Sequence, residues 1–184
     1  MQPIQTRYKG YMFRSRVEAK WVVFFDRLGV RWDYESEGYQ LPNGKGYLPD
    51  FKLVLPDATI VYCEVKSMET DQFEGEHLVK LRALSSGLKC YAILLTGIPA
   101  FRAYNMVYPD ANDNAFSAVL FQDYPPYVIV VDEYWWRVLD IEHSTGILKL
   151  TLDQRGIRKA FGKGYVEAIA AARGARFEFG ETPT

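Results

Sequence analysis

The stretch YLPDFKLVLPDATIVYCEVK, residues 47–66, decides the fold predicted for this chain. Two short runs rich in aromatic and branched side chains flank a Pro56-Asp57-Ala58 turn signal, which predicts two antiparallel strands. In that arrangement the start of the first strand lies beside the end of the second, so Asp50 meets Glu64. Residues two apart in a strand share a face, so Lys66 points the same way as Glu64. The pattern predicts two carboxylates and an amine at one sheet edge.

This group of side chains suits metal-dependent chemistry. Two carboxylates that are buried together repel each other unless one pKa rises or a cation neutralises them, and a hard metal ion is the more economical explanation. Mg²⁺ takes oxygen ligands and usually keeps several waters, which fits two carboxylates and a backbone carbonyl such as that of Val65. Lys66 can then orient or deprotonate the attacking water, or stabilise charge on a phosphate. The residues therefore predict phosphodiester hydrolysis with Mg²⁺ or Mn²⁺.

A helix is expected upstream, over residues 13–28. Its apolar residues recur at helical spacing and Gly29 follows them, which is typical of an amphipathic helix and its end. Ser15 is a good N-cap, and Glu18 stands three residues on in a capping-box arrangement. Glu18 has two interpretations: a cap for the Ser15 N–H, or a site residue that binds a second metal or holds its water. Spacing alone favours the cap.

The remaining elements complete an α/β prediction of a mixed sheet flanked by helices. The pattern predicts a strand over 30–34, a hairpin over 38–46, a helix over 71–86 that Gly87 ends, a strand over 90–95, a polar loop over 99–114, strands over 127–131, 135–141 and 147–152, and a helix over 153–173. Residues 1–97 form the expected core, in the order helix, three strands, helix, strand. Residues 98–184 form an accessory β/α extension packed on the same domain.

Composition limits the protein class. The 184 residues are 48% apolar, which favours one compact domain, and no run approaches the roughly 20 apolar residues that cross a bilayer. The N-terminus shows no signal-peptide pattern, so we expect a cytoplasmic protein with no membrane partner. Cys63 and Cys90 each lie in an apolar strand-like run, which favours buried free thiols over a disulfide or zinc site.

The distribution of charge says more than the net charge of −1. The first 31 residues hold seven basic and two acidic side chains, an excess that can meet phosphates or simply form a solvated helix face. Arg14, Arg16 and Lys20 are the candidate DNA-binding residues in this region. His77 could assist as a base, but nothing in the sequence places it near Lys66, so a surface role is favoured. An aromatic group is expected in a core or an oligomer interface rather than stacked on bases, and consists of Tyr124, Tyr127, Tyr134, Trp135 and Trp136.

Three segments taken together resemble a known family. Residues 13–18 (FRSRVE), 47–51 (YLPDF) and 64–66 (EVK) are similar, in this order, to the PD-(D/E)XK nuclease superfamily, and especially to phage endonuclease I-type Holliday junction resolvases. The resemblance covers about the first 97 residues and implies a restriction-endonuclease-like core. It implies a catalytic set of Glu18, Asp50, Glu64 and Lys66, with Asp50, Glu64 and Glu18 as metal ligands. Glu18 is then a site residue in preference to a cap.

The resemblance also implies the reaction. We expect a metal-dependent deoxyribonuclease of phage or prophage origin, acting in the host cytoplasm, whose first-choice substrate is branched DNA cut by a homodimer. A DNA-end exonuclease, a duplex endonuclease, a nuclease acting on RNA, and a non-catalytic DNA-binding protein that keeps the fold are the alternatives. Residues after Gly97 have no obvious counterpart in the compact endonuclease I pattern, which leaves the branched substrate open.

Overall fold

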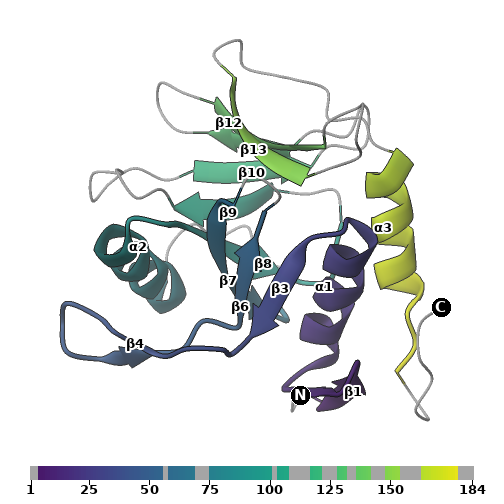
Figure 1. The fold of residues 1–184 in the computed structure, drawn as a ribbon, viewed down its shortest axis with the longest axis horizontal. Coiled ribbons are helices and arrows are strands. Elements are labelled where there is room, and N and C mark those ends of the chain that lie inside the picture. Colours follow the sequence, from purple (N-terminus) through teal and green to yellow (C-terminus); the bar gives the residue numbers. More distant parts are fainter. Residues whose placement is uncertain are drawn as a thin grey trace.

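A computed structural model describes residues 4–55, 58–68, 75–100, 103–107, 117–121, 128–131, 136–141, 148–153 and 163–177. Over these residues the protein has an α/β fold in which helices pack beside one nine-stranded mixed sheet (Figure 1). The helices are α1 (Arg16–Arg27), α2 (Glu76–Leu88) and α3 (Lys163–Gly174). None of these described helices is long and apolar enough to cross a membrane.

The large sheet has the strand order β13-β12-β11-β10-β9-β8-β7-β6-β3. Its strands are β3 (Arg31–Tyr34), β6 (Phe51–Val54), β7 (Ile60–Lys66), β8 (Tyr91–Thr96), β9 (Ala103–Val107), β10 (Ser117–Phe121), β11 (Val128–Val131), β12 (Trp136–Ile141) and β13 (Leu148–Asp153). Only the β7–β8 pair is parallel among the described pairs, and α2 makes the crossover between these two strands. The other pairs in the sheet are antiparallel. Two small hairpins stand apart, β1 (Thr6–Tyr8) with β2 (Tyr11–Phe13) and β4 (Tyr39–Gln40) with β5 (Gly46–Tyr47).

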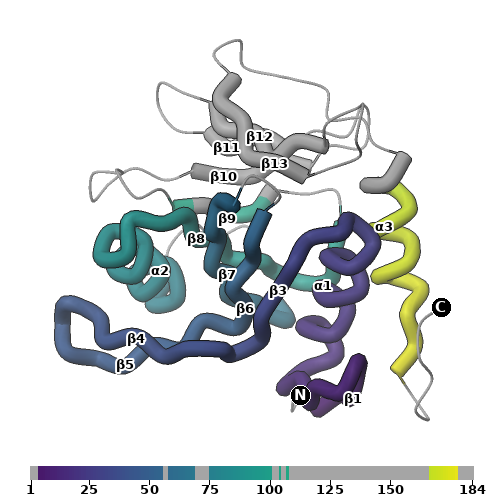
Figure 2. Tube along the Cα trace, in the orientation of Figure 1, coloured from purple at the N-terminus to yellow at the C-terminus, as the bar shows by residue number. Residues whose placement is uncertain are grey.

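The helices lie on opposite faces of the sheet, with α1 and α3 side by side on one face and α2 on the other (Figures 1 and 2). The alternation of side chains along β7 explains why helices pack on both faces of the sheet. Val61, Cys63 and Val65 enter the core beneath α1 and α3, whereas Tyr62 enters the core beneath α2. Because successive strand residues point to opposite faces, this central strand is apolar on both sides until it reaches Glu64.

Helix α1 forms where the sequence predicts it. Ser15 is its N-cap, with a side-chain oxygen that accepts the Glu18 N–H. Trp21, Val22, Phe24 and Phe25 are buried against the sheet. Gly29 follows the helix at φ +66, a conformation that glycine adopts without the steric cost of a side chain.

Helix α2 corrects one prediction, because Gly87 does not end it. The helix continues to Leu88, and Lys89 leaves it in the left-handed conformation at φ +52. Burial of Leu78, Leu81 and Leu84 carries the helix through Gly87, since tertiary packing outweighs a glycine penalty of about 1 kcal/mol. Residues 71–74 of the predicted helix lie outside the described residues.

The second half of the chain contains two further corrections. The predicted loop over 99–114 contains strand β9, which pairs with β8 and β10 and buries Tyr104 and Val107. The predicted helix from residue 153 is wrong at its start, because β13 extends to Asp153 and α3 is described only from Lys163. The hairpin β1–β2 and strand β10 were not predicted.

Other expectations, in the second half of the chain and for the two cysteines, are confirmed. The strands expected over 127–131, 135–141 and 147–152 correspond to β11, β12 and β13. Strands β9 to β13 extend the same sheet past residue 97, and α3 adds Ala168, Ile169 and Ala172 to the core beneath α1. Cys63 and Cys90 are buried free thiols, as expected. Of the aromatic group, the residues Tyr124, Tyr127, Tyr134 and Trp135 lie outside the described residues.

Candidate active site

Two buried carboxylates lie at the edge of the sheet where β6 begins and β7 ends. The antiparallel register sets Phe51 opposite Cys63, so Asp50, one residue earlier, adjoins Glu64, one residue later. The sequence predicted this arrangement. Asp50 is 5% exposed and Glu64 is 6% exposed. The Val65 N–H donates to Asp50 Oδ2 at 2.7 Å, which ties the start of β6 to the end of β7.

Glu64 is held by two neighbours. Lys66 Nζ lies 2.6 Å from Glu64 Oε1, which confirms that these side chains share a face of β7. The hydroxyl of Tyr47 donates to Glu64 Oε2 at 2.8 Å. Burial, followed by the charge of Glu64, raises the pKa of Tyr47, so its hydroxyl stays protonated and keeps donating. Sequence reasoning missed Tyr47, although its position three residues before Asp50 was a signal that it lies nearby.

Glu18 lies in the first turn of α1 and is also buried, with 6% exposure. The Ser15 hydroxyl donates to its Oε1 at 2.8 Å, and the Tyr34 hydroxyl donates to its Oε2 at 2.7 Å. Oε2 also accepts the Arg14 N–H at 3.0 Å. Glu18 thus caps the helix through the Arg14 N–H rather than the expected Ser15 N–H. Burial and the bond to Glu18 raise the pKa of Tyr34 to about 12, so Tyr34 remains a donor.

The electrostatics of Asp50 show that negative charge is in excess here. Burial, and then the charge of Glu64, raises the pKa of Asp50 to about 7 although the Val65 N–H opposes the change, and Glu18 adds a smaller increase. Arg14 Nη2 lies 3.2 Å from Asp50 Oδ1 and also pairs with Glu35. In the network formed by these described contacts, three carboxylates, those of Glu35, Asp50 and Glu64, therefore share two basic side chains, Arg14 and Lys66.

His77 is also close to this group, a position that nothing in the sequence indicated, and its side chain is partly exposed. It occupies the first turn of α2, with Nδ1 3.5 Å from Glu64 Oε1. Burial, and then the charge of Lys66, lowers the pKa of His77. The topology explains the position. Because β7 and β8 are parallel, the crossover helix must run back along the sheet, and its first turn therefore faces the end of β7.

A divalent cation fits Asp50 and Glu64. Mg²⁺ is commonly bound by one or two carboxylates and otherwise by water, and the raised pKa of Asp50 reports two anions that lack full neutralisation. In the described part of the chain, no three His, Cys, Asp or Glu side chains are grouped to hold one ion. Glu18 is therefore not placed with Asp50 and Glu64 around a single point, and its oxygens contact Ser15, Tyr34 and Arg14.

Comparisons with known proteins leave the family open. No family model matches this chain, and no curated protein matches it. The chemistry of the side chains is therefore the basis for assigning a function.

The three candidate DNA-binding residues have different surroundings. Arg14 faces the carboxylates, as described above. Arg16 and Lys20 line a cavity beside the end of α3. Lys20 Nζ donates to the backbone oxygens of Ala172, Arg173 and Ala175 at 2.9 to 3.1 Å. Sequence reasoning missed this structural role of Lys20, and the DNA-binding role of all three residues stays a prediction.

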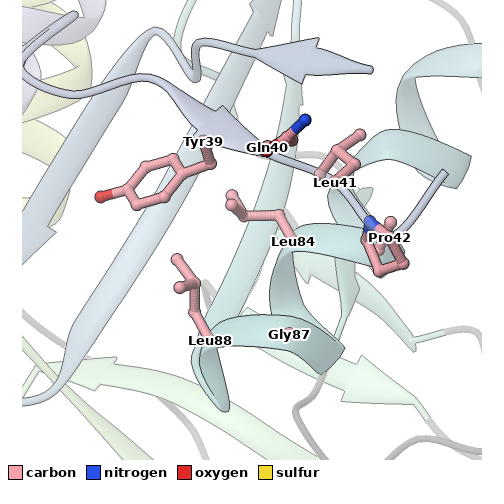
Figure 3. Close-up of a pocket in the computed structure, with 8 residues that line it drawn as sticks. Tyr39, Gln40, Leu41, Pro42, Leu84, Gly87 and Leu88 are labelled. Carbon is pink, nitrogen blue, oxygen red and sulfur yellow. The ribbon is translucent and has the colours of Figure 1, made fainter. Parts of the chain in front are cut away.

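A separate apolar cavity of about 210 Å³ lies between β4 and the second half of α2 (Figure 3). Tyr39 and Leu41 form one wall, and Leu84 and Leu88 form the other. The Tyr39 and Tyr62 hydroxyls are 2.6 Å apart. Among the described residues that line this cavity, none is charged, so the hydrolytic chemistry is assigned to the carboxylate edge.

Proposed function

We propose that this protein is a metal-dependent deoxyribonuclease of the PD-(D/E)XK type, with Glu18, Asp50, Glu64 and Lys66 as its active-site residues. The proposal is carried by the β6–β7 register, which sets Asp50 beside Glu64 with Lys66 on the same face. With the β4–β5 hairpin left out, the elements follow the order α1, β3, β6, β7, α2, β8, and this order supports the proposal of a restriction-endonuclease-like core. Glu18 acts on Asp50 through its charge.

Each residue has a distinct role in the proposed mechanism. Asp50 and Glu64 would hold Mg²⁺ or Mn²⁺, which when bound supplies Lewis-acid stabilisation of a phosphate oxygen and lowers the pKa of a water. Lys66 Nζ, 2.6 Å from Glu64, orients the attacking water or stabilises the negative charge that develops on the phosphate. Tyr47 and the Val65 N–H fix the two carboxylates, so the ligand geometry is set before substrate arrives.

Branched DNA is the proposed substrate, cut by a homodimer that presents two such sites. A DNA-end exonuclease of the same fold remains the alternative within this chemistry. One observation favours a non-catalytic DNA-binding protein. Each oxygen of Asp50 and Glu64 already has a protein donor, among them Arg14 and Lys66, and such a closed network can be purely structural.

The deciding experiment measures cleavage of a labelled four-way junction, linear duplex, single-stranded DNA and matched RNA with Mg²⁺, Mn²⁺ or EDTA. We expect metal-dependent cutting of DNA, reduced at least about 100-fold by Asp50→Ala and by Lys66→Ala, as for the loss of one preorganised electrostatic group. Lys89→Ala is the matched control, because Lys89 is exposed and follows the last turn of α2, at the end of that helix away from His77 and Glu64. DNA binding without any cleavage would establish the non-catalytic alternative.

A further inference from the structure

A second cluster of charge lies on the other side of the first turn of α1. A cavity of about 350 Å³ opens between Arg16 and Lys20 of α1 and the chain that follows α3. Arg173 and Arg176 contribute two further basic side chains to its lining. Among the described residues that line this cavity, none is an aspartate or glutamate. The cavity is therefore strongly basic although the net charge of the chain is −1.

The walls of this basic cavity are fixed by packing. Helix α3 lies against α1 (Figures 1 and 2), and Ala172 and Ala175 enter the core beneath them. Lys20 Nζ makes three hydrogen bonds to backbone oxygens at the end of α3. The Phe177 ring packs edge-on against Tyr8 at 5.7 Å between centroids. Arg173 and Arg176 are thereby held beside Arg16, which lies more than 150 residues earlier in the chain.

Lys20 also changes the electrostatics of the basic cavity. The backbone oxygens that end a helix carry partial negative charge and disfavour a nearby anion. The Lys20 ammonium offsets this charge through its three hydrogen bonds. Arg173 and Arg176 also line the cavity, and the guanidinium group matches the oxygens of a phosphate better than any other cationic side chain.

We propose that the basic cavity binds a backbone phosphate of the DNA near the phosphate that is cut. Arg14, whose side chain contacts Asp50 at 3.2 Å, is only two residues from Arg16, so their Cα atoms are at most about 7 Å apart. DNA rises about 3.4 Å per nucleotide along a strand, so the cavity is within a few nucleotides of the carboxylates. This inference rests on the proposed nuclease function and assigns Arg173 and Arg176 to the substrate path.

The test measures DNA binding by fluorescence anisotropy in EDTA, so that no cleavage occurs, over a series of salt concentrations. We compare the wild type with R173Q/R176Q and with Arg31→Gln. Arg31 is a matched control, since it is an exposed arginine at the end of β3 remote from the Tyr34 end, where the carboxylates lie. Each lost phosphate contact should reduce the slope of log K against log salt by about 1.

We expect R173Q/R176Q to reduce the salt slope by about 1, as for the loss of one phosphate contact, and Arg31→Gln to leave it unchanged. Arg176→Gln alone, an exposed position after the helix, should give about half the effect and guards against misfolding of the double variant. An unchanged slope in both arginine variants, or no DNA binding by the wild type, would overturn the proposal.

Two further measurements separate related outcomes. Calorimetric titration with inorganic phosphate tests a small-molecule source of the same ligand. If phosphate binding is lost in R173Q/R176Q while the DNA slope is unchanged, the cavity holds a free anion and the backbone assignment is wrong. Wild-type cleavage assays separate the two proposals. If R173Q/R176Q reduces the slope but the wild type cuts no DNA, the phosphate-binding proposal is supported and the nuclease proposal is rejected. If the wild type cuts DNA but the slope is unchanged in R173Q/R176Q, only the phosphate-binding proposal is rejected.

Discussion

The first turn of α1 separates two charged regions, one of buried carboxylates and one of exposed basic side chains. Arg14 and Glu18 face the carboxylate edge, where the acids are buried and held by protein donors. Arg16 and Lys20 line the basic cavity, where Arg173 and Arg176 are exposed. Burial makes the carboxylates sensitive to pH and to cations, whereas exposed guanidinium groups respond mainly to salt.

This contrast shows why the net charge of −1 carries little information about partners. Arg16 and Lys20 are four residues apart in α1, so helical spacing sends them to the same side, and Glu18, two residues from each, points away from them. Arg14 precedes the helix, and its N–H donates to Glu18. The alternation in residues 14–20, RSRVEAK, therefore places the residues that contact the carboxylate edge and those that line the basic cavity on two sides of the start of α1.

The largest expected effect that tests this contrast is the pH dependence of stability. The pKa of Asp50 is about 7 in the folded protein, raised from 3.8, so the folded state binds a proton more tightly. The resulting stability is present below about pH 4 and is lost as pH rises through about 7. Without divalent metal, the free energy of unfolding attributable to Asp50 should therefore fall by up to about 4 kcal/mol between pH 4 and pH 8.

Urea unfolding at pH 4 to 8 in EDTA measures this effect as the difference between wild type and Asp50→Asn. Asp33→Asn, on exposed β3, is the control and should retain the wild-type profile. Addition of Mg²⁺ or Mn²⁺ at pH 8 should stabilise the wild type and leave Asp50→Asn unaffected, since a ligand stabilises the state that binds it. Matching profiles for wild type and Asp50→Asn would mean that burial and the neighbouring carboxylates do not raise the pKa of Asp50.

The sequence predicted the carboxylate edge because the information is local. Two short strands follow each other with a proline turn signal between them in the sequence, and their antiparallel register determines that Asp50 adjoins Glu64 and that Lys66 shares its face. The same locality made α1 predictable, since Ser15 and the apolar spacing lie within one segment. The residues assigned to catalysis remain a proposal, which cleavage measurements have to decide.

The features that were missed depend on distant segments. His77 reaches Glu64 only because the β7–β8 pair is parallel, and that pairing is not visible in either strand alone. Lys20 meets α3 across 152 to 155 residues. Strand β9 was hidden because Asn105 and the nearby prolines are typical of loops, whereas burial of Tyr104 and Val107 between neighbouring strands outweighs that preference.

A smaller effect is expected at Lys20, which belongs to the basic cavity but is tied to backbone. Lys20→Met keeps the aliphatic stem and removes three hydrogen bonds to the end of α3. Loss of these donors should lower the free energy of unfolding by about 1 to 3 kcal/mol, and it should weaken DNA binding because Arg173 and Arg176 are no longer held. Lys45→Ala, in an exposed turn, should change neither quantity. Unaltered stability in urea would show that the three bonds are not maintained in solution.

The smallest effect is expected at His77, and Tyr47 provides the comparison within the carboxylate edge. Both side chains face Glu64, but the Tyr47 hydroxyl donates at 2.8 Å, whereas His77 Nδ1 lies at 3.5 Å and has no hydrogen-bond partner within the described part of the chain. Tyr47→Phe should therefore slow single-turnover cleavage about tenfold, the equivalent of one hydrogen bond. His77→Ala should stay within about threefold of wild type at pH 8, since a contact beyond hydrogen-bond distance contributes little. If His77→Ala is the slower variant, the imidazole contacts substrate or metal directly, and the carboxylate edge extends onto α2.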